Sequence, residues 1–534
     1  MAVGFKLIDA TELASLLQGR ERFALFDVRD EGIFARSHLL YANPLPLSDL
    51  ETRLFRLVPD AGTLLVLTSD EGDGLVERAI EQCTTLGYRN LRVLDGGNAA
   101  WLRAGYKLFK GIHVPSKAFG EVVDDHYRTP TIGPADLYAL LEEQRPGQPR
   151  VHLYDCRPPH EFHRMSLPGA RNCPGVDLLS RLPALVDPDD TVVINCAGRT
   201  RGILGAQSLI NARLPGRVMT LKNGTMGLHL AGFPLESGRT DLVESVEPKR
   251  LDDMRERMAD LRQEFDIPVL SLQSWQEVTD SGALLLDVRP PWEYSTGHFP
   301  GARNAPGGQL LQATDFYVAV RNAPIVLMDD DGIRASITAS WLAQMGIPFV
   351  SVLDHRDIQG LLGKTGVESW VPVKQVPPLA RITYQALQQD LNQGQTLLLD
   401  IRSSDDYYKA HLPEARFVIR SRFPGSVPRL PRRASITLIA NDPVTAAFAA
   451  RELEASYGAP LRLLEGGNEA WIQAGLPVES GLGGAIDPPE DMWHIPSSPL
   501  GGLESAMRDY ISWEVGLTSQ IMDEPGYRFS VGSR

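Results

Sequence analysis

One pattern, repeated four times at domain-sized intervals, constrains the fold of this chain more than any other feature. Each copy has an apolar run that ends in Asp-x-Arg, then a short acidic or aromatic segment, then a loop related to His-x-Pro-Gly-Ala. The intervals of about 110 to 130 residues are those of whole domains, not of solenoid repeats. The sequence therefore predicts four copies of one domain. They are ALFDVRDEGIFARSHLLYA with Asp27, Arg29 and His38, HLYDCRPPHEFHRMSLPGARN with Asp155, Arg157 and Glu161, LLLDVRPPWEYSTGHFPGARN with Asp287, Arg289 and His298, and LLLDIRSSDDYYKAHLPEAR with Asp400, Arg402 and His411.

Each copy continues in the same order. A second apolar strand follows, then a helix with small and apolar residues, then a third strand that leads into a glycine turn. Near-continuously apolar strands that alternate with helices indicate a parallel sheet covered on both faces. Ligands of such sheets bind beyond the carboxyl ends of the strands. The second strands are LLVLTSD, VVINCAG, IVLMDDD and ITLIAND, and the turns are VLDGGNAAW, TLKNGTMGL and LLEGGNEAW, with only VLDHRDIQGL in the third copy.

A cysteine stands at one of these strand ends. Cys196 lies in VVINCAGRTRG, between an apolar strand and a predicted helix over 203–210. A thiol at that junction faces backbone N–H groups and the positive end of the helix dipole, and both favour the thiolate. Arg199 and Arg201 strengthen this effect and attract an anionic substrate. The alternative is a buried structural cysteine that happens to precede a helix.

Composition narrows the class of protein. The chain has 534 residues, which suggests about three to five domains. Its net charge is −14 without any block of like charges, which argues against a nucleic-acid or anionic-membrane surface. The four cysteines form no CxxC pair, so we expect a reducing compartment and no disulfide, metal or cofactor. Without a signal sequence or an apolar run of about 18 residues, we expect a cytoplasmic protein that does not enter membranes.

The connections and the tail have their own character. The segment 244–265 reads as a charged amphipathic helical linker, and the tail, 483–534, contains one predicted helix, LESAMRDYISWEVGLTSQIMDE. Leu503, Met507, Tyr510, Trp513 and Leu517 fall near one face of that helix. We expect this face to pack on the body of the protein, and the alternative is a partner-binding helix. The predicted copies span residues 1–110, 125–243, 266–373 and 379–482.

Together these motifs resemble the rhodanese (sulfurtransferase) family. The Asp-x-Arg strand, the His-x-Pro-Gly-Ala loop, the strand–Cys loop–helix and the GGNxAW turn recur in order over almost the whole chain. The resemblance implies an α/β fold of four tandem rhodanese-like domains, each with a five-stranded parallel sheet and helices on both faces. It also implies a catalytic cysteine at the head of the active-site loop.

Only the second copy has that cysteine. Aligned on the second strand, Ser69, Asp329 and Asn441 fall opposite Cys196. The corresponding loops are SDEGDG, DDDGIR and NDPVTA; the first and third copies are acidic there, and only the third keeps an arginine. Such loops repel a sulfur oxyanion, so we expect copies one, three and four to be inactive.

The resemblance implies a sulfur-transfer reaction at Cys196. The thiolate takes a sulfane sulfur from a donor, for which thiosulfate is our first choice, and passes it to a thiol or cyanide. A protein is the alternative sulfur donor or acceptor. Arg199 and Arg201 neutralise the donor, the loop amides stabilise the persulfide, and Gly198 lets the backbone curl around it. The predicted site consists of Cys196 as nucleophile and Ala197, Gly198, Arg199, Thr200 and Arg201 as substrate-binding residues.

Several roles in this site stay open. Thr200 either donates its hydroxyl to the sulfur or caps the helix that begins at Arg201. Arg199 and Arg201 could be ordinary exposed residues, although cations at a helix N-terminus are unfavourable without an anion. Cys156 and Cys173 are expected to be structural rather than resolving thiols.

Two other residue sets are expected to serve the fold. Asp155, Arg157 and Glu161 read as a stabilising ion-pair set rather than as catalytic groups. Ser166 replaces the usual histidine of the His-x-Pro-Gly-Ala loop in the second copy, so that histidine is expected to be structural.

Two other functions compete with a thiosulfate sulfurtransferase. The chain could be a sulfur carrier or scaffold that a partner's persulfide loads at Cys196. A phosphatase or arsenate reductase is less favoured, because such enzymes need Cys-x5-Arg and Arg201 stands at Cys-x4-Arg.

Overall fold

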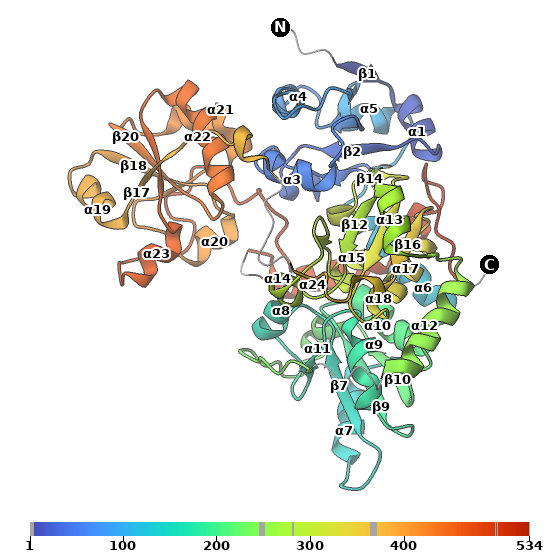
Figure 1. The fold of residues 1–534 in the computed structure, drawn as a ribbon. Helices are drawn as coiled ribbons and strands as arrows, with labels where there is room; N and C mark the ends of the chain where they lie inside the picture. Colours follow the sequence, from blue (N-terminus) through green and yellow to red (C-terminus); the bar gives the residue numbers. More distant parts are fainter. Residues whose placement is uncertain are drawn as a thin grey trace. The chain divides into compact units, whose positions relative to one another are not determined.

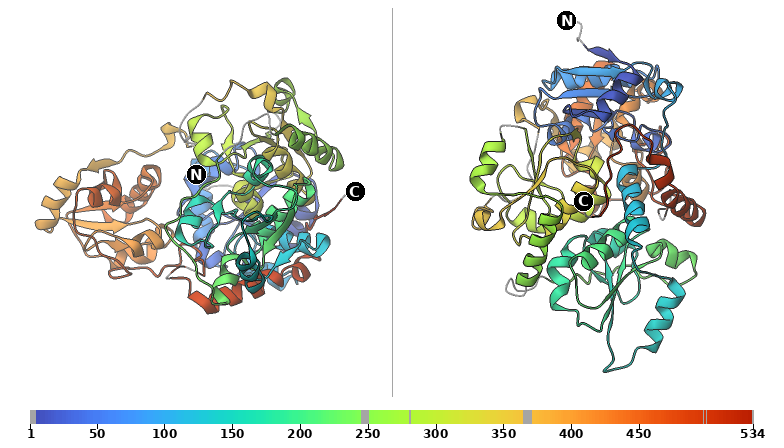
Figure 2. Two further views of the ribbon diagram at one scale, coloured as in Figure 1. Left: turned by 90° about the horizontal axis from the view of Figure 1, so that it is seen from below. Right: turned by 90° about the vertical axis from the view of Figure 1, so that its right-hand side faces the viewer.

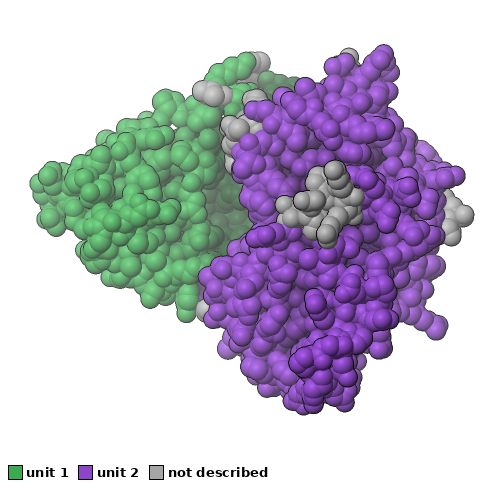
Figure 3. All heavy atoms as spheres, turned by 60° about the horizontal axis from the view of Figure 1, so that its bottom comes forward, with its two compact units in different colours: residues 1–13, 23–112, 368–494 green, residues 14–22, 113–367, 495–534 purple. Residues whose placement is uncertain are grey.

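The structure is a computed structural model that describes residues 5–244, 251–279, 282–363, 371–496, 498 and 500–532. The chain divides into two compact units (Figure 3). Unit 1 consists of residues 1–13, 23–112 and 368–494, and unit 2 of residues 14–22, 113–367 and 495–534. Each unit thus combines two copies of the repeat: the first with the fourth, and the second with the third. The C-terminal tail from residue 495 belongs to unit 2.

Each copy contributes five parallel strands to its sheet, in the same strand order, as predicted (Figure 1). In the second copy this order is β6-β10-β9-β7-β8. In unit 1 the first copy contains β1 (Lys6–Ile8), β2 (Phe23–Asp27), β3 (Asn43–Pro44), β4 (Leu64–Thr68) and β5 (Leu91–Leu94), and the fourth contains β17 (Ala380–Ile382), β18 (Thr396–Asp400), β19 (Arg416–Phe417), β20 (Ser435–Ile439) and β21 (Leu461–Leu464). In unit 2 the second copy contains β6 (Thr131–Ile132), β7 (Val151–Asp155), β8 (Arg171–Asn172), β9 (Thr191–Asn195) and β10 (Arg217–Leu221), and the third contains β11 (Val269–Leu270), β12 (Leu284–Asp287), β13 (Arg303–Asn304), β15 (Ile325–Met328) and β16 (Val350–Leu353), with the short β14 at Val320–Arg321.

Helices connect the strands and cover the sheets, because parallel strands require crossovers (Figure 1). The first copy has α1 (Ala10–Gln18), α2 (Glu31–Phe34), α3 (Leu50–Leu57), α4 (Leu75–Thr85) and α5 (Gly97–Arg103), followed by α6 (Val114–Tyr127). The second has α7 (Pro134–Glu143), α8 (Pro159–Arg164), α9 (Asp177–Arg181), α10 (Thr200–Asn211) and α11 (Gly224–Leu230). The third has α12 (Asp252–Glu264), α13 (Leu272–Thr279), α14 (Pro291–Thr296), α15 (Gly307–Gln312), α16 (Thr314–Tyr317), α17 (Arg334–Gln344) and α18 (His355–Ile358). The fourth has α19 (Tyr384–Asn392), α20 (Ser404–Lys409), α21 (Phe423–Ser426), α22 (Pro443–Tyr457) and α23 (Gly467–Gln473), and the tail has α24 (Leu503–Val515) and α25 (Thr518–Ile521). Short 3-10 turns lie at Leu182–Ala184, Val373–Gln375, Arg420–Arg422 and Val427–Arg429.

The Asp-x-Arg motif forms a buried ion pair in every copy. In the second copy Arg157 donates to both carboxylate oxygens of Asp155 and to the backbone carbonyl of Met165. The arginine bridges the end of its strand to the residue eight positions later, so it fixes the loop that follows. The same contacts occur in the pairs Asp27–Arg29, Asp287–Arg289 and Asp400–Arg402. Asp155 and Arg157 therefore serve the fold, as expected.

The loop histidines are also structural. His298 stacks on the ring of Tyr294 at 3.9 Å and bonds through Nδ1 to the carbonyl of that residue. His38 on Phe34 and His411 on Tyr407 repeat this arrangement. In the second copy the Ser166 hydroxyl donates to the Glu236 carbonyl instead.

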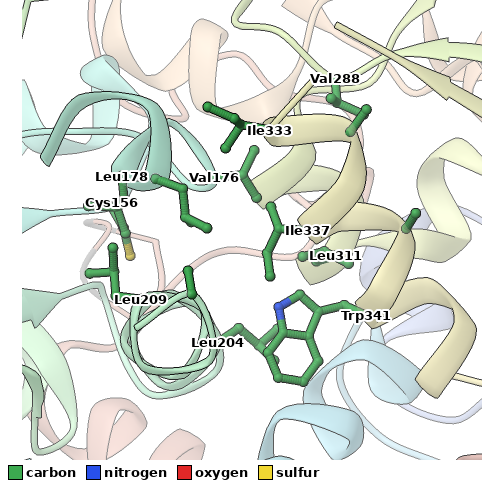
Figure 4. Packing of buried hydrophobic residues seen from close by; sticks show 14 of the residues in the cluster. Cys156, Val176, Leu178, Leu204, Leu209, Val288, Leu311, Ile333, Ile337 and Trp341 are labelled. Atoms are coloured by element: carbon green, nitrogen blue, oxygen red, sulfur yellow. The ribbon is translucent and has the colours of Figure 1, made fainter. Parts of the chain in front are cut away.

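Unit 2 has one continuous apolar core that the second and third copies share (Figure 4). Leu204 of α10 points toward Trp341 of α17, and Leu209 lies on the other side of α10, beside Cys156. The indole Nε1–H of Trp341 donates to the Ser208 hydroxyl at 2.8 Å. The predicted linker helix, 244–265, corresponds to α12, which buries three apolar side chains against this core. Residues 245–250 of the predicted span lie outside the described residues.

Replacing Trp341 with Ala should lower the free energy of unfolding by about 3–5 kcal/mol, because it leaves a cavity at the core that joins two copies. Urea unfolding followed by circular dichroism measures this change. Phe349→Ala is the matched control, since Phe349 is 47% exposed in the same copy and its truncation should cost about 0.5 kcal/mol or less. Equal losses in the two variants would contradict a shared core.

Candidate active site

Cys196 lies directly after β9 and is the first residue of the loop 196–199, which leads into α10. Asn195 pairs in register with Asp155 of β7, and its side-chain amide donates to the Asp155 carboxylate at 2.9 Å. Because side chains alternate along a strand, Cys196 points to the opposite face, beneath α10. Its Sγ lies 3.4 Å from the position that a Cβ on Gly202 would take.

Strand register identifies the residues that replace the cysteine in the other copies. Thr68 and Met328 pair with the aspartate of the Asp-x-Arg motif in their own copies, as Asn195 pairs with Asp155. The residues that follow them, Ser69 and Asp329, therefore stand at the cysteine position in the first and third copies, as predicted. In the fourth copy Ile439 takes that place, so Ala440 stands at the cysteine position. The prediction of Asn441 is wrong by one residue. Sequence alignment without the strand pairing did not determine the register of the second strand in this copy. None of these three positions carries a thiol.

A glycine turn holds the backbone of the Cys196 loop. Gly224 has φ +57°, and a Cβ there would lie 2.2 Å from the Cys196 carbonyl oxygen. The following N–H groups of Thr225 and Met226 donate to the carbonyls of Cys196 and Ala197 at 2.8 and 3.0 Å. Only glycine allows so close an approach, so the turn fixes the backbone of Cys196.

The thiol of Cys196 is enclosed. The residue is 3% exposed, and its Sγ accepts a hydrogen bond from the Gly202 N–H and lies 3.6 Å from the Arg199 carbonyl. Burial raises the pKa of this thiol above its ordinary value, and the Glu514 carboxylate raises it further, against the lowering effect of Arg201. Arg201 and the Gly202 N–H lower this pKa, as predicted for the loop, but desolvation outweighs them, so the predicted net preference for the thiolate is wrong for this arrangement.

Both loop arginines bind carboxylates of the chain itself. Arg199 donates to both oxygens of Glu121 at 2.7 and 2.8 Å and to Asp124 at 2.9 Å, and both carboxylates come from α6. Arg201 forms a two-point ion pair with Glu161 at 2.7 and 2.8 Å, which lowers the pKa of Glu161 to about 2 despite burial. Glu161, expected beside Asp155 and Arg157, thus serves to hold a loop arginine.

Thr200 takes neither of its two predicted roles. Its hydroxyl donates to Glu514 Oε1 at 2.5 Å, and its N–H lies 3.4 Å from the same oxygen. The helix α10 begins at Thr200, with Arg199 as its N-cap residue and without a side-chain cap. Glu514 belongs to α24, so the tail helix packs on the body, as predicted, and lies against α6 and α11 (Figure 2).

The structure thus adds site residues that the sequence did not reveal. Lys117 of α6 is buried with its Nζ 3.9 Å from Glu514 Oε1, and Tyr510 of α24 approaches Gly198. Gln309 of the third copy accepts from Arg201 at 3.2 Å. The predicted apolar face of the tail helix includes Tyr510, but no sequence pattern singled out the carboxylate four residues later.

The pH dependence of Cys196 alkylation tests this charge balance. We expect the rate with iodoacetamide to rise with pH through values above those of an ordinary cysteine, because only the thiolate reacts. Arg201→Gln should move the midpoint further up, since Arg201 is the largest influence that lowers this pKa. Arg199→Gln, in the same loop but paired with Glu121 and Asp124, is the matched control and should move it less. A downward or absent shift in Arg201→Gln would overturn the assignment.

In the residues that the structure describes, no group of three His, Cys, Asp or Glu side chains could hold a metal ion. Within these ranges, no helix has the length and apolar character needed to span a bilayer.

Comparison with known proteins gives one match in each copy. The family model of the Rhodanese-like domain matches residues 9–104, 134–231, 271–355 and 383–474. A crystal structure of thiosulfate sulfurtransferase from Pseudomonas aeruginosa is 37% identical, with a TM-score of 0.92, and the similarity covers 99% of this chain and 100% of that chain. An HTH-type transcriptional regulator of Mycobacterium tuberculosis is 30% identical over 128 residues, which are 22% of this chain. The chain spans 55% of the length of that curated relative.

Proposed function

We propose that this chain, which belongs to the rhodanese-like domain family, is a sulfurtransferase that carries sulfane sulfur as a persulfide on Cys196. The observation that carries the proposal is the position of Cys196 at the strand–helix junction of the second copy. There the thiol accepts a backbone N–H, and the residues at this position in the other three copies lack a thiol. Ala197, Gly198, Arg199, Thr200 and Arg201 form the rest of the loop.

Thiosulfate is the donor that we propose. The whole-chain similarity to a thiosulfate sulfurtransferase supports this choice. The Cys196 thiolate attacks the outer sulfur of thiosulfate, the sulfur–sulfur bond breaks, and sulfite leaves with the bonding electron pair. A thiolate or cyanide then attacks the outer sulfur of the persulfide, and Cys196 leaves as thiolate.

The residues of this chain position and stabilise the reacting sulfur. The Gly202 N–H already donates to Sγ, and the N–H groups at the start of α10 favour the anionic persulfide. Arg201 supplies positive charge close to the thiolate, while Glu161 fixes the direction of its guanidinium. Since these groups are placed before the reaction, little reorganisation is needed in the transition state.

In this proposal the other three copies do not carry sulfur themselves. The third copy shares its core with the second and contributes Gln309 to the Arg201 side chain. The first and fourth copies lack a thiol at the cysteine position and form a unit together. In their corresponding loops, the carboxyl groups of Asp73 and Asp442 accept the backbone N–H groups.

Mass spectrometry of the full chain tests the proposal. Incubation with thiosulfate should add the mass of one sulfur atom, and cyanide should remove it again. Cys196→Ala should give no adduct, whereas the control Cys83→Ala, which changes a buried thiol of unit 1, should keep it. Lack of an adduct in the wild-type chain, or an adduct that survives in Cys196→Ala, would refute it.

The same samples separate the competing functions. Loading by a cysteine desulfurase persulfide but not by thiosulfate would indicate a sulfur carrier. Hydrolysis of an aryl phosphate that depends on Cys196 would indicate a phosphatase.

A further inference from the structure

The geometry points to Glu514 as the residue that controls the access of anionic sulfur donors to Cys196. Its carboxylate occupies the position on the loop where the oxygens of such a donor would bind. The inference rests on the proposed function for the identity of the donor, but its test uses the reactivity of Cys196 alone.

The loops of the inactive copies show that this junction binds a carboxyl group. In the first copy Asp73 accepts a hydrogen bond from the Leu75 N–H at 2.9 Å. In the third, Asp329 stands at the cysteine position and accepts from the N–H groups of Gly332 and Ala335, each at 2.7 Å. Backbone N–H groups at the start of a helix lack partners within the helix, so a nearby carboxyl group satisfies them.

The fourth copy follows the same rule. Asp442 accepts from the N–H groups of Val444 and Thr445 at 3.1 and 2.9 Å. In the second copy Glu514 supplies the carboxylate, which binds the N–H and hydroxyl of Thr200. The three other carboxyl groups belong to their own loops, whereas Glu514 comes from a helix 314 residues further along the chain. The only loop with a thiol is therefore the one whose carboxylate can leave without unfolding the loop.

The contacts of Glu514 are those that an oxyanion would use. In addition to its contacts with Thr200, Glu514 forms an ion pair with Lys117, with 3.9 Å between Oε1 and Nζ. This is the only ion pair of Lys117 among the described residues. Arg199 and Arg201 are already held by carboxylates of α6 and α8. If Glu514 leaves, Lys117 becomes a buried cation without a partner, and a sulfonate group can replace the lost carboxylate.

The binding of Glu514 is also incomplete. The side chain is fully buried, yet its Oε2 has no hydrogen-bond donor among the described residues. A buried carboxylate oxygen without a donor costs free energy, which weakens the binding of the Glu514 carboxylate to the loop. A donor with several charged oxygens can satisfy more of the available groups, so it can compete with Glu514. Anionic donors must therefore displace a like charge, and Glu514 determines how well they reach Cys196.

Alkylation of Cys196 with two reagents of different charge tests this inference. Iodoacetate is anionic and iodoacetamide is neutral, and their ratio of rates reports the charge at the site independently of sulfur transfer. We expect Glu514→Gln to raise the ratio of iodoacetate to iodoacetamide rates about tenfold or more, because it removes a unit charge near the reacting sulfur. Asp509→Asn is the matched control, since it makes the same charge change at an exposed position of the same helix and should leave the ratio unchanged.

A second variant keeps the inference testable if Glu514→Gln folds poorly. Lys117→Met should lower the same ratio, because it removes the cation that remains for an incoming anion. Peptide mapping confirms that Cys196 is the labelled residue, and circular dichroism confirms folding. In Glu514→Gln the KM for thiosulfate should fall.

The outcomes separate this inference from the proposed function. An equal rise of both alkylation rates in Glu514→Gln would mean that α24 only covers the thiol, and an unchanged ratio would mean that Glu514 does not face the incoming donor; either overturns the inference. A raised ratio in a chain that thiosulfate does not load would refute the proposed donor and leave the role of Glu514 intact.

Discussion

The N–H groups that each domain exposes between its second strand and the following helix set the main physical requirement of this structure. They lack partners within the helix, so each loop needs an acceptor. Asp73, Asp329 and Asp442 meet this need within their own loops. In the second copy the Cys196 sulfur accepts the Gly202 N–H, and Glu514 accepts the N–H and the hydroxyl of Thr200. One backbone arrangement thus gives three self-satisfied loops and one that depends on a distant segment.

That dependence explains why Cys196 is surrounded by parts of unit 2 outside its own domain. The helix α6 supplies Lys117, the tail helix α24 supplies Glu514, and the third copy supplies Gln309. These contacts bury the thiol, and burial rather than the loop's charge decides the direction of its pKa. The thiol is therefore enclosed by three segments, and under our proposal its reactivity toward anions depends on the removal of a carboxylate.

The buried ion pairs divide the work of holding this site. Asp155 and Arg157 fix the strand end, as their counterparts do in every copy. Glu161 holds Arg201, and Glu121 holds Arg199, so both guanidinium groups have fixed directions. Buried pairs of this kind add little net stability, but breaking one leaves a buried charge. Their role is to define where positive charge lies around the sulfur.

Much of the fold follows from short-range patterns that the sequence displays. Apolar strands, helix spacing and glycine turns depend on near neighbours, so the four copies, their parallel sheets and the special position of Cys196 could be predicted. The register of the second strand in the fourth copy could not be predicted. The sequence alone does not decide whether Ala440 or Asn441 stands at the cysteine position, and the strand pairing identifies Ala440.

By itself, the sequence determined that one loop in four carries a thiol and two arginines at a strand–helix junction. Only the tertiary structure decided what those groups face: Arg199 and Arg201 meet carboxylates, and Glu514 meets Thr200. The physical reason is that a buried polar side chain takes its partner from whichever element packs against it. Here those elements, α6 and α24, lie far apart in the chain, and nothing in their local sequence records that they meet at Cys196.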